Sequence, residues 1–332
     1  MAIILDAMGS DDYPHPEIEA AVNFCKQKKE KVILVGNEDV IRPELIKFDF
    51  PKEFLEIIHA PEVVEMTDKP VESGRAKPNN SMAIGIAQLK KFEKSAFVTA
   101  GNTGAAMFNA TRILGRIKGV DRPALPAVIP TQSGKCVVVD VGVNVDCKAA
   151  FLFQFAVYGC TYARSMLGIA KPRVGLLSNG EEEGKGNTLV KETYPLLKKS
   201  NLNFIGNVEA KEIYSGKVDV VVTDGFIGNV FLKTSEAVAK FMFDSLKQEL
   251  YANVRNKIGA ALAKPAFSNL KKLMDPDEVG ALPLLGVDGL VLIGHGRSNS
   301  RAIESALTQA ERCISANFLP EMKVALQEEL KR

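Results

Sequence analysis

The sequence has no excess of charge of either sign. Its 42 lysine and arginine residues stand against 40 aspartate and glutamate residues, which leaves a formal charge of +2 over 332 residues. Proteins that bind nucleic acid usually carry a clear basic excess. We therefore expect no nucleic-acid partner, and any basic surface must be local.

The sequence also lacks the cysteine spacings that mark disulfide frameworks and zinc sites. Its five cysteines are far apart, are odd in number and form no C-x-x-C pair. This usage fits a reducing cytoplasm and predicts no metal site. No apolar run reaches 18 residues, and the opening "MAIILDAMGSDD" is too short in its apolar part for a signal peptide. We expect a soluble cytoplasmic protein that can still touch a membrane surface.

Several motifs of well-known catalysts are missing. There is no G-x-G-x-x-G and no G-x-S-x-G, and the run from Gly180 through Gly184 to Lys185 is one residue too short for a Walker loop. Cys160 lies in the apolar "FAVYGCTYA" and is interpreted as a core thiol. The sequence thus offers no obvious covalent nucleophile, and we expect no cofactor.

Short Val- and Ile-rich runs alternate with longer segments of helical period. The runs are "AIILDAM", "KVILVG", "FLEIIHA", "SAFVTA", "KCVVVDVG", "RVGLLSNG", "VDVVVTDG" and "LVLIGHG". This alternation predicts an α/β fold with a mostly parallel sheet covered by helices on both faces. No repeat or linker-like segment divides the chain, so residues 1–332 are expected to form a single α/β/α domain.

Residues 234–275 break this rhythm with one helical segment after another, and we expect an inserted helical excursion. Val238, Phe241, Met242 and Leu246 are spaced as one apolar stripe. Between residues 251 and 274 there are five basic residues and no acidic one: Arg255, Lys257, Lys264, Lys271 and Lys272. The segment is either a dimer-forming helix pair with a solvated basic face or a contact for a membrane surface or an acidic partner.

The stretch "TAGNTGA" follows one of the predicted strands. Gly101 and Gly104 allow backbone to approach a ligand closely, while Asn102 and Thr103 can cap the next helix and donate hydrogen bonds. A helix N-terminus presented in this way suits an anion, above all phosphate. The alternative is an ordinary turn between strand and helix.

Other predicted strands end in polar residues of the same kind. They are Asp6 and Asp11, Asp140 and Asn144, Lys185, Asn187 and Thr188, Asp224, Asn229 and Lys233, and His295. Each residue alone can be structural, since aspartates bond backbone amides and asparagines cap helices. Because the carboxyl ends of parallel strands face one edge of a sheet, we expect the set to share one cleft.

A site of glycines, amides and a lysine suits a reaction in which the nucleophile is itself a substrate. Phosphate can attack an activated acyl group such as a thioester if the protein holds both and stabilises the oxyanion. Proximity removes roughly 7 to 11 kcal/mol of barrier, and one oxyanion donor contributes about 3 to 4 kcal/mol.

Taken in order, the blocks "LDAMGSD", "RAKPNNSM", "TAGNTGA", "DVGVNVDC", "NGEEEGKGN", "TDGFIGNVFLKTSE" and "LLGVDGLVLIGHGRSN" resemble the bacterial phosphate acyltransferase family of phospholipid synthesis, from residue 3 to about residue 310. The resemblance implies transfer of a long acyl chain from acyl carrier protein to inorganic phosphate. It also implies a fold like that of isopropylmalate and isocitrate dehydrogenases, a homodimer, and peripheral attachment to the membrane.

The chemistry assigns roles to the candidate residues. Gly101, Asn102, Thr103, Gly104 and Asn187 are expected to hold phosphate, and Lys185 to neutralise charge as the tetrahedral intermediate forms. His295 is a candidate oxyanion donor or acid for the leaving thiolate, and Asn229 a third catalytic candidate. The remaining cleft candidates are Asp6, Asp140, Asn144, Asp224 and Lys233.

Two other functions remain open at this point. One is a metal- and nicotinamide-dependent dehydrogenase of similar architecture, in which Asp140 and Asp224 would hold the metal. The other is a non-catalytic scaffold at the membrane surface, which would need the helical segment but not the polar strand ends.

Overall fold

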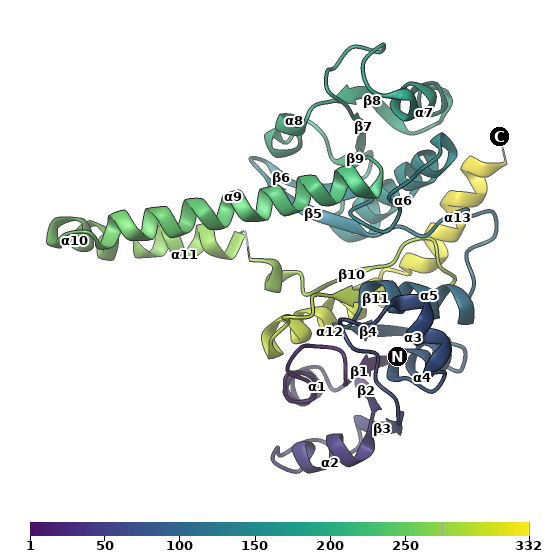
Figure 1. Ribbon diagram of the computed structural model, residues 1–332, viewed down its shortest axis with the longest axis vertical. Coiled ribbons are helices and arrows are strands. Elements are labelled where there is room, and N and C mark those ends of the chain that lie inside the picture. The colour runs from purple at the N-terminus through teal and green to yellow at the C-terminus, as the bar shows by residue number, and fades with distance from the viewer. Residues whose placement is uncertain (274, 332) are drawn as a thin grey trace.

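The computed structural model describes residues 1–273 and 275–331, and its strands form two sheets (Figure 1). The first sheet has the order β10-β11-β4-β1-β2-β3. Its strands are β1 (Ala2–Asp6), β2 (Lys31–Gly36), β3 (Leu55–His59), β4 (Ser95–Thr99), β10 (Ala281–Pro283) and β11 (Val291–Gly294). All neighbours are parallel except β10, which pairs antiparallel with β11.

The second sheet has the order β5-β6-β9-β7-β8. Its strands are β5 (Pro126–Thr131), β6 (Gly134–Val139), β7 (Arg173–Leu177), β8 (Asn203–Val208) and β9 (Val220–Val222), and β5 alone runs antiparallel to its neighbour. The eight predicted strand runs are confirmed. The expectation of one sheet was wrong, because apolar periodicity marks a strand without saying which strand pairs with it.

Helices cover both faces of each sheet. In the first half they are α1 (His15–Lys28), α2 (Glu38–Leu45), α3 (Pro70–Ala76), α4 (Ser81–Gln88) and α5 (Thr103–Ile113). The second half adds α6 (Ala149–Leu167), α7 (Thr188–Lys199) and α8 (Ala210–Ser215), and the chain closes with the short η1 (Pro276–Glu278), α12 (Ser300–Ser315) and α13 (Phe318–Leu330). Alternate residues of β6 belong to different cores: Val137 and Val139 pack with α6, and Cys136 and Val138 with α8. This two-sided burial explains the continuous apolar runs.

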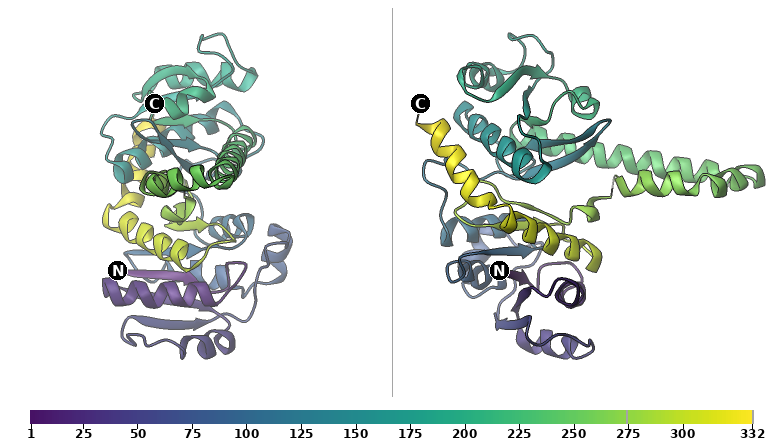
Figure 2. Two further views of the ribbon diagram at one scale, coloured as in Figure 1. Left: turned by 90° about the vertical axis from the view of Figure 1, so that its left-hand side faces the viewer. Right: turned by 180° about the vertical axis from the view of Figure 1, so that it is seen from behind.

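One hydrophobic cluster joins the two sheets. It contains Leu5 and Val98 of the first sheet, Val137 of the second, and residues of α6, α12 and α13 between them. Figure 2 shows the two sheet units one above the other, with helices α12 and α13 running from one to the other. The two sheets therefore share a core.

Three helices form an arm that projects from the body: α9 (Gly225–Tyr251), α10 (Val254–Leu262) and α11 (Lys264–Leu273) (Figures 1 and 2). Helix α9 begins with Asp224, whose Oδ1 accepts a hydrogen bond from the Ile227 amide at 2.9 Å. A Cβ on Gly228 would lie 1.9 Å from the Asp140 carbonyl oxygen, so only glycine lets the first turn pack against the end of β6. The predicted excursion at 234–275 corresponds to the outer part of α9 with α10 and α11.

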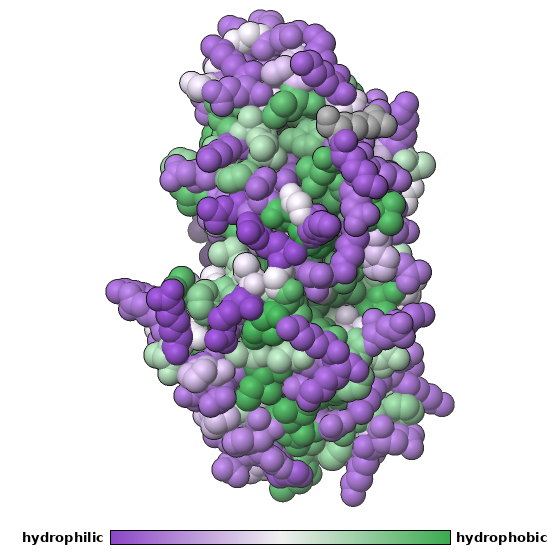
Figure 3. Space-filling model, turned by 90° about the vertical axis from the view of Figure 1, so that its right-hand side faces the viewer, coloured by the Kyte–Doolittle hydropathy of each residue, from purple (hydrophilic) through white to green (hydrophobic). Residues whose placement is uncertain are grey.

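None of the helices in the described part of the chain combines the length and the apolar character needed to cross a bilayer. The face turned away from the arm carries hydrophilic residues between hydrophobic ones (Figure 3).

Candidate functional site

The loops after β4, β6 and β11 meet α9 at a cleft of about 460 Å³ between the two sheets. Its wall on the first sheet includes Gly101, Thr103 and His295; its wall on the second includes Gly142 and Asn229. Ligands of parallel α/β sheets bind outside the carboxyl ends of the strands, and this volume is in the range of small-ligand sites. The cleft is therefore the candidate site.

Helix α5 points its N-terminus at this cleft. The Asn102 side chain caps the helix by accepting a 3.0 Å hydrogen bond from the Ala105 amide, and Thr103 is the first helical residue. Thr103 is exposed and lines the cleft. The first amides of a helix have no partner within the helix and attract anions.

The side chain of Asn102 is fully occupied. Besides capping α5, its Nδ2 donates to the carbonyl oxygens of Met66 at 3.1 Å and Asp68 at 3.0 Å. It is buried and ties residues 65–68 to the start of α5. In this structure the Asn102 amide positions the loop, and the backbone borders the cleft, while phosphate binding by Asn102 stays a prediction.

Close packing explains the small residues after β4. A Cβ on Gly101 would lie 2.4 Å from Met82 Cε and 3.3 Å from Gly9 Cα, and one on Gly104 would lie 2.5 Å from Pro70 Cγ. The Gly101 amide donates to the Thr99 hydroxyl at 3.0 Å. The rigid ring of Pro70 leaves no room for a side chain at Gly104, whereas a side chain at Gly101 would displace the flexible end of Met82. The Gly101 backbone borders the cleft.

Asp6 is buried behind this loop. Its Oδ2 accepts from the Thr99 hydroxyl at 2.7 Å and its Oδ1 from the Met8 amide at 3.1 Å, and burial raises the pKa of the carboxyl. It does not line the cleft. Asp6 therefore supports the loop and does not face a ligand.

Asp140 and Asn144 hold the loop after β6 in the same way. Asp140 accepts from the amides of Leu125 at 3.0 Å and Asn144 at 2.7 Å, while Asn144 donates to the Pro123 carbonyl at 2.7 Å. Residues 141–143 line the cleft, but these two polar residues and the helix-capping Asp224 do not. These three side chains hydrogen-bond to the backbone near the cleft and do not line it, so their roles as cleft residues stay predictions.

Helix α9 supplies the polar side chains of the second wall. Asn229 and Lys233 are exposed and line the cleft, together with Glu236, which accepts an ion-pair contact from Lys233 at 2.9 Å. Asn229 lies beside Gly142, where a Cβ would come within 3.0 Å of its Nδ2. Gly142 has φ of +131°, a conformation that favours glycine.

His295 faces the cleft from the loop after β11. Its partial burial, with the nearby charges of Arg297 and Lys233, lowers its pKa below 6.5, so the ring is neutral at pH 7. The Arg297 amide approaches Nδ1 at 3.4 Å. With Nδ1 as the acceptor, the neutral ring carries its proton on Nε2.

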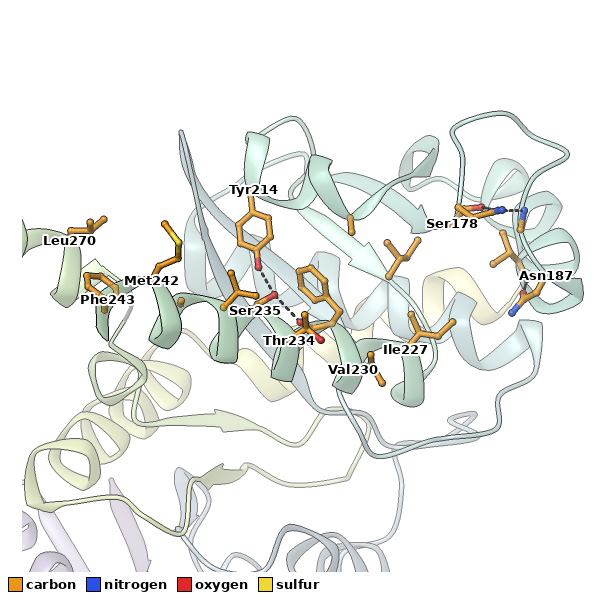
Figure 4. A pocket seen from close by; sticks show the side chains of 18 of the residues that line it. Ser178, Asn187, Tyr214, Ile227, Val230, Thr234, Ser235, Met242, Phe243 and Leu270 are labelled. Atoms are coloured by element: carbon orange, nitrogen blue, oxygen red, sulfur yellow. Dashed lines mark hydrogen bonds between the residues drawn. The ribbon is translucent and has the colours of Figure 1, made fainter. Parts of the chain in front are cut away.

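Lys185 and Asn187 do not line the cleft. Both are exposed in the segment between β7 and α7, where Asn187 caps α7 by accepting from the Val190 amide at 3.0 Å. Asn187 borders another pocket, here called the outer pocket, of about 1240 Å³. Figure 4 shows Ser178 and Asn187 at one end of this outer pocket and Met242, Phe243 and Leu270 at the other.

Helix α9 separates the two pockets. Residues 229, 233 and 236 face the cleft, and residues 227, 230, 234 and 238 face the outer pocket. At 100° per residue these two sets lie on opposite sides of the helix. The expectation that Lys185 and Asn187 lie in one cleft with Gly101 is corrected. It assumed that all strands end at the edge of a single sheet, whereas Gly101 follows a strand of the first sheet and Lys185 and Asn187 follow a strand of the second.

Several cleft residues carry no signal in the amino-acid sequence. Met66, Val141, Val143 and the segment 279–282 line the cleft with apolar side chains or backbone. Glu236 was also missed, although a glutamate three residues after a lysine on a helix predicts an ion pair, here with Lys233.

Comparison with known sequences gives a consistent result. The family model described as "Fatty acid synthesis protein" matches residues 1–321. The phosphate acyltransferase of Acidobacterium capsulatum is 48% identical over 315 residues, covering 95% of this chain and 94% of the relative. That of Elusimicrobium minutum is 46% identical over 329 residues, covering 99% and 96%.

Solved structures share the fold at low sequence identity. A phosphotransacetylase from Streptococcus pyogenes has a TM-score of 0.61 at 17% identity, with 94% of both chains covered. A protein assigned as a 4-hydroxythreonine-4-phosphate dehydrogenase from Salmonella typhimurium has a TM-score of 0.53 at 12% identity, covering 94% of this chain and 98% of that one. The predicted dehydrogenase-like architecture is confirmed.

Proposed function

Because the chain belongs to the phosphate acyltransferase family and is an acyltransferase of lipid synthesis, we propose that it moves a long fatty acyl group from acyl carrier protein to inorganic phosphate. The product is an acyl phosphate. In this reaction a phosphate oxygen attacks the thioester carbonyl, the C–S bond breaks, and the thiolate leaves and takes up a proton.

Phosphate binds at the N-terminus of α5 in this proposal. The backbone around Gly101 and Thr103 supplies amides and a hydroxyl at the cleft wall, and Lys233 supplies a positive charge across the cleft. Backbone amides fixed by close packing need no rearrangement when the anion arrives. Asn102 and Asp6 act as positioning residues, since their side chains hold the loop.

His295 donates from Nε2 to the carbonyl oxygen that becomes negative during attack. A neutral ring with its proton on Nε2 is a hydrogen-bond donor at pH 7, and the lowered pKa keeps it neutral. This favours the oxyanion role over that of an acid for the thiolate. Asn229, also on the cleft wall, is a second donor in reach of the same space.

The observation that carries the proposal is a single cleft in which a helix N-terminus and a neutral histidine meet. The test mixes the purified protein with palmitoyl carrier protein and follows free thiol with and without inorganic phosphate, trapping acyl phosphate with hydroxylamine. We expect phosphate-dependent thiol release and a trapped hydroxamate. Release without phosphate would instead indicate a thioesterase.

A second copy of the chain is the proposed partner of the stripe on α9. Val238, Phe241 and Met242 are 53%, 67% and 61% exposed in the single chain, and Leu246 is 38% exposed. An exposed apolar stripe on a projecting helix is stabilised when another copy of the chain covers it, because its apolar surface is then removed from water. Sedimentation should give a dimer, and Phe241→Glu should give a monomer.

The end of the arm is proposed to touch an anionic membrane. Val254, Ile258 and Leu262 are 73%, 60% and 81% exposed, and Arg255, Lys257 and Lys264 are exposed in the same part of the arm. Lys272 is exposed at the base of the arm, where its Nζ lies 4.0 Å from Glu278 Oε1. The side chain of Lys271 lies outside the described residues. Apolar residues would insert at the interface between the lipid headgroups and the acyl chains, and each basic residue would add about 1 kcal/mol of attraction to anionic lipids. Together these contributions give reversible, salt-sensitive attachment. Replacing Arg255 and Lys257 by Glu should abolish cosedimentation with anionic vesicles and leave turnover in solution unchanged.

A further inference from the structure

The cleft continues into a groove at the base of the arm. This side groove, of about 650 Å³, lies between β5, α9 and α11. It shares Val128, Leu232, Glu236 and Val279 with the cleft. A continuous surface thus leads from His295 and Thr103 past Leu232 into the side groove.

The walls of the side groove are largely apolar. Val128 and Ile129 of β5 stand on one side, and Ala239 and Phe243 of α9 on the other. On α9, residues 232, 236, 239 and 243 follow the spacing of one helix face. Leu232, Ala239 and Phe243 are only partly buried, so the groove keeps apolar surface open to a ligand.

Charged groups also line the side groove. Lys135, Lys240, Lys272 and Arg297 are exposed and lie with Asp275 and Glu278 among the lining residues. A hydrocarbon chain can lie along β5 and α9 while its reactive end stays in the cleft. The outer pocket also borders Ala239 and Phe243, but it lacks this position, because it shares no lining residue with the cleft.

We propose that the side groove holds the hydrocarbon chain of the acyl donor, and that Ala239 and Phe243 set the length it accepts. This inference rests on the proposed function, since it needs the thioester in the cleft. Each methylene removed from water strengthens binding by about fourfold. Donors should therefore gain affinity with length until the chain fills the groove.

The test compares acyl carrier protein thioesters of 8 to 18 carbons. Ala239→Phe narrows the passage and is expected to lower kcat/KM at least tenfold for the 16-carbon donor and less than threefold for the 8-carbon donor. Phe243→Ala opens the far end and is expected to move the optimum toward longer chains. Ala237→Phe is the matched control, because Ala237 is exposed on the same helix and lines neither the groove nor the cleft. Ala239 and Phe243 also border the outer pocket, so Ala210→Phe, which narrows that pocket alone, is a second control and should leave the chain-length profile unchanged.

A direct binding measurement separates the groove from the chemistry. The sequence has no tryptophan, so the fluorescence of bound parinaric acid can be read without tryptophan background. Ala239→Phe is expected to weaken this binding at least tenfold and Ala237→Phe to leave it unchanged, with thermal melts confirming that both variants fold.

The outcomes are distinguishable. If the unmodified protein makes no acyl phosphate from any donor, both the proposed function and this inference are overturned. If it does make acyl phosphate while Ala239→Phe and Phe243→Ala both leave the chain-length profile unchanged, or lower all lengths equally, the groove assignment alone is overturned.

Discussion

The hydroxyl of Thr99 donates a 2.7 Å hydrogen bond to the buried carboxyl of Asp6, from the end of β4 to the end of the neighbouring β1. The same hydroxyl accepts from the Gly101 amide at 3.0 Å. One side chain thus joins the two strand ends that precede the cleft and fixes the turn into α5.

Thr99→Val should therefore destabilise the protein by about 1 to 3 kcal/mol, because a buried carboxyl and a buried amide both lose a partner. Thr99→Ser keeps the hydroxyl and should lose less than half as much. Urea unfolding of both variants measures the difference. Equal losses would show that the methyl group, and not the hydrogen bonds, matters.

His295 gives activity a predictable pH dependence. Its pKa lies below 6.5, so the neutral ring predominates at pH 7. The required neutral form is lost as pH falls through this lowered pKa, and kcat should fall there while staying level between pH 7 and 8. The stability that the folded protein gains from the neutral ring is lost in the same direction.

Substitutions at His295 test its role as a donor. His295→Phe should lower kcat about 100-fold or more, the usual effect of losing one oxyanion donor. His295→Gln keeps an N–H group and should retain more activity without the acid limb of the pH profile. An unchanged acid limb in this variant would assign it to another group.

Lys185 should not affect phosphate binding if the cleft is the phosphate site. It is exposed on the side of the outer pocket, beyond α9. Lys185→Ala should leave the KM for phosphate within about twofold, as should the control Lys191→Ala on the exposed side of α7. A tenfold rise in KM for Lys185→Ala alone would return this lysine to the phosphate site.

The buried Glu17 is expected to lower the stability of the folded protein as pH rises from mild acid to neutral. The side chain is buried, accepts a 2.9 Å hydrogen bond from the Ser10 amide, and has its pKa raised to about 7 chiefly by burial. The raised pKa means that the stabilising neutral form is fully present below the unfolded value of 4.5 and is lost as pH rises through about 7.

Removing this charge should reveal the effect. Relative to the unmodified protein, Glu17→Gln should gain about 3 kcal/mol in unfolding free energy between pH 4.5 and pH 8. Urea unfolding of both proteins at both pH values gives the difference in unfolding free energy between them at each pH. A change in packing contributes equally at the two pH values, so it cancels when the two differences are compared. A constant difference would mean that Glu17 does not titrate in this range.

The sequence predicted most strands because their continuous apolar runs are buried on both faces, as in β1 and β2, although the edge strand β3 is partly exposed. It did not predict the pairing. The edge strands β5, β8 and β10 have mixed burial and were missed, and with them the division into two sheets. Pairing depends on contacts between distant residues, which periodicity does not record.

The candidate site was predicted in part for the same reason. Gly101, Thr103, Asn229, Lys233 and His295 do meet in one cleft. Asp6, Asp140, Asn144 and Asp224 were chosen because polar residues end strands, but an aspartate that satisfies backbone amides and one that faces a ligand look alike in sequence. Lys185 follows β7 of the second sheet and does not line the cleft, which the expectation of one shared sheet edge did not foresee.

Helix α9 runs without proline from the cleft at Asn229 to the far end of the arm at Tyr251. An unbroken helix transmits angular position: each added residue turns everything beyond it by 100° and advances it by 1.5 Å. One alanine inserted after Lys240 would keep the cleft wall in register and rotate Phe241, Met242 and Leu246 away from whatever surface they meet. Because one continuous helix joins them, the orientation of the arm relative to the opening of the cleft is fixed. A contact made at the tip of the arm would therefore also set the direction in which the cleft opens.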